Sequence, residues 1–392
     1  MIPVNEPLIG EREFEYVTEC LKTGWISSAG RFIEEFEHKW ASYCGMKYGI
    51  AVSNGTVALQ VAVKSLDLKP GDEVIIPTFT IISCALAVIY NGAKPVLVDS
   101  EPRTWTMDVN KIEEKITART KAIMPVHIYG HPCRMDKIWE LAKRYDLKIV
   151  EDAAEAHGAE YKGRRCGGLG DISCFSFYAN KIITTGEGGM VLTNNEEYAQ
   201  RARSLRNLSF IKERRFYHTE LGHNFRLTNL QAAIGLAQLE RIDEIIEKKR
   251  WIGHSYTERL KDTEGLILPI EESEAKSIYW MYGLVLDDNF IEFNAESFGN
   301  KLMEEGIETR PFFLGMHEQP VFHNMGLFKD ERYPVATEIA KQGLYLPSGL
   351  TLTEQQIEKV VTSVKKVLRE RNLPSPSRGG AGWGWVNKRI VD

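Results

Sequence analysis

Lys181 is the residue in this sequence whose surroundings most favour nucleophilic chemistry. It lies in the segment GDISCFSFYANKIITTGEGG (170–189), after an aromatic, apolar run and before a turn rich in threonine and glycine. Most lysines are solvated surface charges, but burial among apolar residues favours the neutral form of an amine. A neutral amine can attack an aldehyde, and Ser176, five residues earlier, could donate a hydrogen bond to a phosphate. The alternative interpretation is a structural lysine whose ammonium group extends out of an apolar segment.

Acidic residues follow the predicted strand KIVED (148–152), in the motif VEDAAEAHG (150–158). Glu151 and Asp152 are adjacent, so along a strand their side chains must point to opposite faces. A carboxylate in a ligand crevice can keep a pyridine nitrogen protonated, and the protonated ring withdraws electrons from a substrate carbanion. Glu155 lies three residues further on and could reach the same ligand. An acidic cap on the following segment explains the motif equally well.

The motif SNGTVAL (53–59) could bind an anion, because it follows a predicted strand and opens a predicted helix. Gly55 and Thr56 would place backbone N–H groups and a hydroxyl at the helix N-terminus, which suits a phosphate dianion. Ordinary capping by the preceding Ser or Asn is a common alternative, and this motif alone favours capping.

A fourth polar motif, LGHNFRLTNLQAAIG (221–235), forms a predicted turn before a long helix. Asn224 and Arg226 could reach a phosphate or a carboxylate, and the guanidinium group suits planar anions. A helix entry with a surface arginine is the alternative interpretation.

Short apolar runs between residues 48 and 194 must position these motifs. Helical patterns separate several of the runs, which predicts an α/β domain with a largely parallel sheet. In such sheets, ligands bind beyond the carboxyl ends of the strands. The seven predicted strands are YGIAV (48–52), EVIIP (73–77), PVLVD (95–99), AIMPV (122–126), KIVED (148–152), ISCFSF (172–177) and GMVLT (189–193).

The chain of 392 residues is long for one core, which indicates two domains. We expect a large domain over 1–248 and a smaller α+β domain over 249–373. Apolar residues at helical spacing predict a long connecting helix over 227–260. The tail over 374–392 is rich in Pro, Ser and Gly, so we expect it to lack order.

Composition argues against several kinds of partner. The formal charge of −5 gives no electrostatic reason to expect nucleic acid or a membrane. The chain shows no signal-peptide pattern and no apolar run that could span a bilayer, so we expect a cytoplasmic protein. Its six cysteines form no CxxC pair, which favours buried free thiols over disulfides or a metal site.

Together the four motifs resemble those of the sugar aminotransferases of the DegT/DnrJ/EryC1/StrS family. This family is a branch of the fold-type I, aspartate aminotransferase-like enzymes that use pyridoxal 5'-phosphate. The resemblance covers about residues 7–373, and 170–189 is its most specific segment. It implies a large domain with a mostly parallel mixed sheet, a smaller α+β C-terminal domain and pyridoxal phosphate as cofactor.

The resemblance also implies roles for individual residues. Lys181 would carry the cofactor as an imine, and Asp152 would pair with the pyridine nitrogen. Gly55, Thr56 and Ser176 would hold the phosphate. Ile81 departs from the family pattern, because many relatives place an aromatic residue against the cofactor ring there. Other residues expected at the cofactor or the substrate are Glu155, Ser27, Ser28, Arg31, Arg226 and His317.

The same resemblance implies a second copy of the chain and two substrates as partners. Asn224 would reach the phosphate of the neighbouring subunit's cofactor, which implies a homodimer with shared active sites. The stretches 24–37, 98–117 and 310–322 are similar to members that transfer the amino group of L-glutamate to a GDP-linked keto sugar for O-antigen or other surface polysaccharide.

Alternatives to this substrate and this activity stay open. A UDP- or dTDP-linked keto sugar would use the same cofactor motifs. A non-catalytic sensor or scaffold that binds pyridoxal phosphate is a second class, although it has no need of Lys181, Asp152 and Ser176 together. Family members that remove the sugar C3 hydroxyl carry His at the lysine position, so Lys181 disfavours that reaction. A nicotinamide-binding protein lacks support, because no GxGxxG motif follows the first predicted strands.

Overall fold

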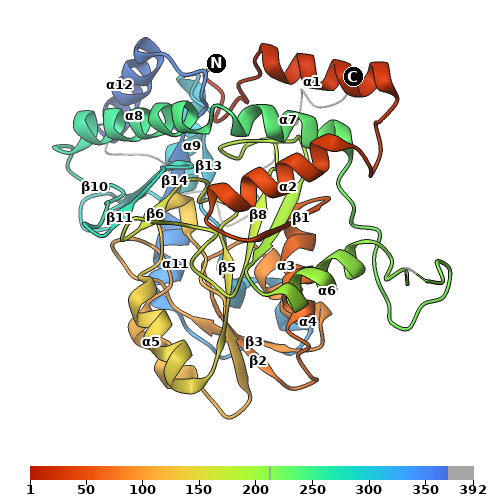
Figure 1. Ribbon diagram of the computed structural model, residues 1–392. Helices are drawn as coiled ribbons and strands as arrows, with labels where there is room; N and C mark the ends of the chain where they lie inside the picture. Colours follow the sequence, from red (N-terminus) through yellow and green to blue (C-terminus); the bar gives the residue numbers. More distant parts are fainter. Residues whose placement is uncertain (212, 370–392) are drawn as a thin grey trace.

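A mixed seven-stranded sheet forms the centre of the larger part of the molecule (Figure 1). Its strand order is β1-β9-β8-β5-β4-β2-β3. The computed structural model describes residues 1–211 and 213–369. Strand β9 is antiparallel to both of its neighbours, and the other neighbouring pairs are parallel, which confirms the predicted mostly parallel sheet. The strands are β1 (Tyr48–Val52), β2 (Glu73–Pro77), β3 (Lys94–Val98), β4 (Thr120–Ile123), β5 (Lys148–Asp152), β8 (Ile172–Ser176) and β9 (Gly189–Thr193).

The predicted strands agree with the observed ones to within three residues at each end. The largest difference is at AIMPV (122–126), because β4 ends at Ile123. Pro125 follows two residues later, and proline has no N–H group for a strand ladder. The chain nevertheless stays close to β5 there, since the Asp152 N–H donates to the Pro125 carbonyl over 2.9 Å.

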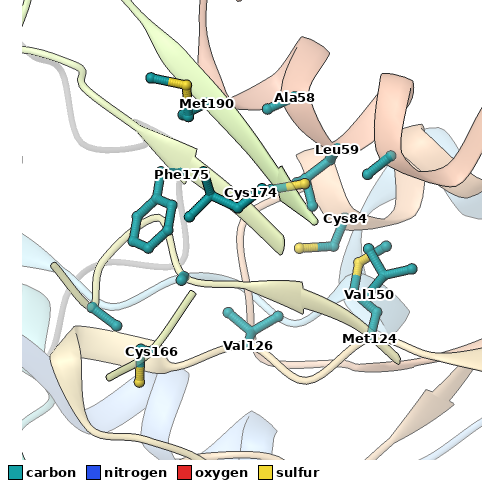
Figure 2. Packing of buried hydrophobic residues seen from close by; sticks show 14 of the residues in the cluster. Ala58, Leu59, Cys84, Met124, Val126, Val150, Cys166, Cys174, Phe175 and Met190 are labelled. Carbon is teal, nitrogen blue, oxygen red and sulfur yellow. The ribbon is translucent and has the colours of Figure 1, made fainter. Parts of the chain in front are cut away.

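Helices cover the sheet and bury its apolar residues. Helix α3 packs on β8 and β9, and α2 packs on β1 and α7. Figure 2 shows part of the buried cluster, with Leu59 of α3, Cys84 of α4, Val150 of β5 and Cys174 of β8. All six cysteines are buried and free, as expected. The helices of this part are α1 (Glu11–Thr23), α2 (Arg31–Tyr43), α3 (Gly55–Ser65), α4 (Ser83–Tyr90), α5 (Met135–Tyr145), α6 (Glu196–Arg206), α7 (Asn229–Leu239) and α8 (Ile242–Leu260).

The predicted single helix over 227–260 is wrong in one respect, because it is two helices. Helix α7 ends at Leu239 and α8 begins at Ile242, and Arg241 between them has φ −122° and ψ 23°. The Arg241 guanidinium donates to the Leu8 carbonyl over 2.5 Å and to Glu13 Oε1 over 2.6 Å. These tertiary contacts with the N-terminal segment override the local helical pattern.

A second, antiparallel sheet with the order β10-β12-β14-β13 organises the C-terminal part, as the α+β prediction expects. Its buried cluster also includes Ile2, which pairs with Ile307, so the N-terminus packs against this part. The proposed boundary at residue 248 falls within α8. The elements are β10 (Leu266–Ile267), β12 (Tyr282–Leu286), α9 (Ala295–Glu304), β13 (Arg310–Pro311), α10 (Pro320–Asn324), α11 (Pro334–Gln342), β14 (Gly343–Leu346) and α12 (Glu354–Arg369).

A third, small sheet lies between the two parts, with β6 (Glu160–Tyr161) paired to both β7 (Arg164–Arg165) and β11 (Ala275–Lys276). The expectation that 374–392 lacks order falls outside the described residues. Among the described helices, none combines the length and the apolar character needed to cross a membrane.

Candidate active site

Four polar segments meet at the edge of the sheet where the parallel strands end. Residues 53–56 follow β1 and residues 78–83 follow β2, while the segments 152–155 and 176–181 start at the last residues of β5 and β8. Because β9 is antiparallel, its first residues lie at the same edge. The sheet therefore brings motifs that are far apart in sequence to one place, which is the usual ligand position in such a fold.

Lys181 lies at the centre of these segments with its amine nearly buried. The side chain is 10% exposed, and Nζ lies 3.4 Å from Glu155 Oε1 and 3.7 Å from the centre of the Trp280 ring. A ring face and a carboxylate both attract an ammonium group. Glu155 is itself buried and accepts a hydrogen bond from the Tyr129 N–H over 2.8 Å, and burial raises the pKa of Glu155. The free amine of Lys181 thus has a defined position.

Trp280 is a site residue that the sequence analysis missed. Its indole Nε1–H donates to the Asn180 carbonyl over 2.8 Å, and its backbone N–H donates to the Tyr129 carbonyl over 3.0 Å. The ring stacks on Tyr129, with 6.2 Å between ring centres. Trp280 lies just before β12, in an apolar segment whose pattern predicts only a strand. No local signal connects such a residue to Lys181, so only the tertiary structure reveals the contact.

Glu151 and Asp152 have separate sets of partners, which fits side chains on opposite faces of β5. Glu151 is fully buried and accepts hydrogen bonds from His127, from Ser173 and from three backbone N–H groups over 167–170. Although burial alone would raise it, the hydrogen bonds from His127 and from these N–H groups lower the pKa of Glu151. This carboxylate is saturated, so its role is to hold the 167–170 turn against the sheet.

Asp152 is equally buried but much less well satisfied. It accepts a weak hydrogen bond from Cys84 Sγ over 3.2 Å and one from the Ala154 N–H over 3.0 Å. Burial raises the pKa of Asp152, since removal from water disfavours the charged form. No ion pair joins this carboxylate to a cation in the described ranges of the chain. It is therefore suited to receive a positively charged group of a ligand.

The first turn of α3 and the end of β8 lie in close contact and carry several polar groups. Gly55 lies so close to Ser176 that a Cβ at Gly55 would be 2.6 Å from the Ser176 Cβ. The hydroxyls of Thr56 and Ser83 are 2.8 Å apart. Asn54 caps the helix by accepting from the Val57 N–H over 3.0 Å. The turn therefore combines an ordinary cap with first-turn N–H groups that have no intrahelical acceptor, so the anion site stays a prediction.

The segment after β2 carries the predicted residue Ile81 and contacts a second predicted residue, His317. Ile81 is 47% exposed, so its side chain is free to contact a ligand. His317 is buried, and its Nδ1 lies 2.7 Å from Thr78 Oγ1 while Nε2 lies 2.9 Å from Thr337 Oγ1. His317 thus connects the C-terminal part of the chain to the turn that bears Ile81.

The remaining predicted substrate residues lie in other surroundings. Ser28 and Arg226 line a separate cavity of about 740 Å³ together with Arg203, Arg206 and Arg215. Arg226 donates to Asn207 Oδ1 over 2.7 Å, and this cavity does not include Lys181 in its lining.

Three other predicted residues have contacts that do not involve Lys181, Asp152 or Glu155. The Ser27 carbonyl accepts from the Asn229 N–H over 2.6 Å. Arg31 forms ion pairs with Glu19 and Glu35 on the surface of α1 and α2. Asn224 is exposed and pairs through its backbone with Asn207, at the base of the segment that joins α6 to α7. In one chain, the structure thus groups Lys181, Asp152, Glu155, Gly55, Thr56 and Ser176, and leaves Ser27, Arg31 and Asn224 apart from them.

The chain is similar over nearly its whole length to proteins of one known family. A family model described as the DegT/DnrJ/EryC1/StrS aminotransferase family matches residues 7–365. The GDP-perosamine synthase of Caulobacter vibrioides is 44% identical over 368 residues, which cover 94% of this chain and 98% of that relative. The GDP-perosamine synthase of Escherichia coli O157:H7 is 42% identical, with 94% and 99% covered. Among solved structures, S. venezuelae DesV is 34% identical with a TM-score of 0.85, covering 91% of this chain and 94% of that one.

Proposed function

The chain belongs to the DegT/DnrJ/EryC1/StrS aminotransferase family, and we propose that it is a GDP-perosamine synthase. It transfers the amino group of L-glutamate to the keto carbon of GDP-4-keto-6-deoxymannose, yielding GDP-perosamine and 2-oxoglutarate. The observation that carries this proposal is the nearly buried Lys181 amine beside a buried, under-satisfied Asp152. The names of the two GDP-perosamine synthases support the choice of nucleotide sugar.

The residues around Lys181 fit pyridoxal phosphate as the cofactor. A protonated pyridine nitrogen would supply an ion-pair partner to buried Asp152, which forms no ion pair among the described residues. The hydroxyls of Thr56 and Ser176, together with the first turn of α3, provide donors that suit a phosphate dianion. Close contact between Gly55 and Ser176 leaves no room for a larger side chain at this turn.

Each residue of the pocket then has a distinct task. When bound, the cofactor supplies an electron-withdrawing ring and a carbon that carries the amino group between the two substrates. Lys181 Nζ removes a proton from the substrate carbon that bears nitrogen, and later returns a proton. Glu155 and the Trp280 ring hold the free amine in position for this transfer. Asp152 keeps the proton on the ring nitrogen, and Ser176 orients the phosphate.

We further propose a homodimer in which each subunit completes the other's site. The segment between α6 and α7 extends away from the body of the molecule (Figure 1). It exposes large apolar side chains, with Phe216 82% and Leu221 87% exposed. Exposed apolar groups of this size favour burial against a partner. A second copy placed there would bring Asn224 toward the phosphate of the neighbouring cofactor.

An absorbance titration of the full chain tests the activity. Purified protein is loaded with pyridoxal phosphate and given L-glutamate, and then GDP-4-keto-6-deoxymannose or its UDP- and dTDP-linked counterparts. Glutamate should replace the band of lysine-bound cofactor with that of the aminated cofactor. Only the GDP-linked sugar should restore the first band.

Two variants make the outcome specific to the site. Lys181→Ala should lose the first band, whereas Lys162→Ala, at an exposed lysine paired with Asp136, should behave as the wild type does. Restoration by a UDP- or dTDP-linked sugar would overturn the substrate and leave the aminotransferase. A wild-type protein that never forms the lysine-bound band would overturn the proposal at its first step.

A further inference from the structure

A second buried lysine lies close to Lys181 and has no part in the proposed chemistry. Lys249 of α8 is 3% exposed, and its Nζ donates to the Trp280 carbonyl and to the Ser348 carbonyl, each over 2.6 Å. Lys249 and Lys181 line the same small cavity of about 10 Å³. Through the Trp280 carbonyl, Lys249 therefore contacts the residue whose ring touches the Lys181 amine.

The burial of the Lys249 amine is energetically unfavourable, which indicates that the amine has a specific task. No ion pair joins it to a carboxylate in the portion of the chain that the structure describes, and burial lowers the pKa of Lys249 to about 7. An apolar side chain of similar length would avoid the cost of removing an amine from water. The amine is instead used to bind two carbonyl groups at the ends of neighbouring strands, since Trp280 precedes β12 and Ser348 follows β14.

The bond from Lys249 completes the restraints on Trp280. The other two polar groups of this residue are already engaged, the indole N–H with the Asn180 carbonyl and the backbone N–H with the Tyr129 carbonyl. Asn180 precedes Lys181 directly, so the ring and the lysine share a fixed frame. Loss of the third restraint would allow the start of β12, and the ring with it, to move away from the Lys181 amine.

We infer that Lys249 is a positioning residue for Lys181, which acts by holding the Trp280 ring against the Lys181 amine. The inference rests on the proposed function, because it assumes that Lys181 binds the cofactor and transfers the proton. It adds a residue of α8 to the machinery of the site, acting through the Trp280 carbonyl.

Lys249→Met tests the inference, with Lys248→Met as a matched control. Lys248 is the neighbouring lysine on α8, and its Nζ lies over the Trp251 ring, 3.9 Å from the ring centre. The first readout is the pH at which the absorbance of the lysine-bound cofactor changes. This midpoint should move by about 0.5 unit or more in Lys249→Met and stay in place in Lys248→Met, since it reports the surroundings of Lys181.

The second readout is the single-turnover rate with L-glutamate. We expect a fall of about tenfold or more in Lys249→Met, because small misplacement of a proton-transfer group is costly. The KM for the GDP-linked sugar should stay within about twofold of the wild-type value. In a Trp280→Leu background, Lys249→Met should add nothing to either readout, because coupled residues are not additive.

Three results would overturn the inference and leave the proposed function intact. One is a lower melting temperature in Lys249→Met with an unchanged midpoint and an unchanged glutamate rate. Another is full additivity with Trp280→Leu. If Lys249→Met does not fold, Trp280→Phe is the replacement test, because it keeps the hydrogen bond to the Trp280 carbonyl and makes the ring smaller. An unchanged midpoint in Trp280→Phe would then overturn the inference. A wild-type protein without the lysine-bound band would instead defeat the proposed function.

Discussion

The role of each residue near Lys181 depends more on its surroundings than on its residue type. Glu151 and Asp152 are adjacent, carry the same charge and are both buried, yet Glu151 has its oxygens saturated and Asp152 does not. Spacing along β5 predicts that they face opposite sides, but it cannot say which side holds the ligand. The number of hydrogen-bond donors around each carboxylate makes that distinction.

At the residue scale, we predict that His157 makes the stability of the chain depend on pH. It is fully buried among Trp40, Phe175 and Phe177, and burial, with the nearby charge of Lys181, lowers the pKa of His157 to about 3. The unfolded chain binds a proton near the ordinary value of 6.5 whereas the folded chain does not. Above pH 6.5, His157 therefore does not affect the free energy of unfolding. As the pH falls from 6.5 toward 3, the His157 contribution lowers that free energy.

His157→Phe should remove this contribution, because phenylalanine suits the aromatic surroundings and does not titrate. We expect the loss of unfolding free energy between pH 7 and pH 5 to be smaller by about 2 kcal/mol than in the wild type. Denaturant unfolding at both pH values measures it. His38 is exposed, so His38→Gln should show the wild-type change in unfolding free energy between pH 7 and pH 5. If His157→Phe and the wild type lost the same unfolding free energy between pH 7 and pH 5, His157 would titrate normally in the folded chain.

At the scale of elements, the contact between α3 and β8 shapes the predicted phosphate site. Alanine has a higher helix propensity than glycine, so local preference alone would favour Gly55→Ala. The new Cβ, however, would lie 2.6 Å from the Ser176 Cβ. We expect Gly55→Ala to lower stability by about 1–3 kcal/mol through overpacking and to weaken the binding of pyridoxal phosphate about tenfold or more. Thermal unfolding and cofactor titration measure these two effects.

Two further variants identify the cause of such a loss. Thr56→Ser keeps the hydroxyl and should bind the cofactor nearly as the wild type does. Gly55→Ala combined with Ser176→Gly removes the clash and should recover stability, but not full cofactor affinity, because one hydroxyl is gone. Unchanged stability in Gly55→Ala alone would show that α3 shifts easily and that the close contact is not required.

The elements that form local patterns were predictable from sequence, and the contacts between distant elements were not. Runs such as YGIAV (48–52) and KIVED (148–152) match β1 and β5, since apolar β-branched runs between turn signals specify buried strands. The break between α7 and α8 depends on Arg241 reaching Leu8. The position of Trp280 depends on packing of the C-terminal part against Lys181. Neither contact leaves a periodic signal in its own segment.

At the scale of the whole molecule, the open question is which chain supplies each part of a site. Lys181 and Asp152 lie near each other in one chain, whereas Asn224 is exposed at the base of the segment between α6 and α7. A homodimer with shared sites would combine Lys181 of one subunit with Asn224 of the other. Two inactive variants could then complement each other.

Mixed dimers of Lys181→Ala and Asn224→Asp test this arrangement. Asn224→Asp keeps the shape and places a negative charge near the phosphate, so each variant alone should be nearly inactive. After random exchange of subunits, half of the dimers are mixed, and each mixed dimer has one intact site of two. Activity should therefore reach about one quarter of the wild-type value. Mixing Lys181→Ala with Asp152→Asn should give no gain, because those two lesions always leave one defect in each site. Equal activity in both mixtures would mean that Asn224 serves the site of its own chain.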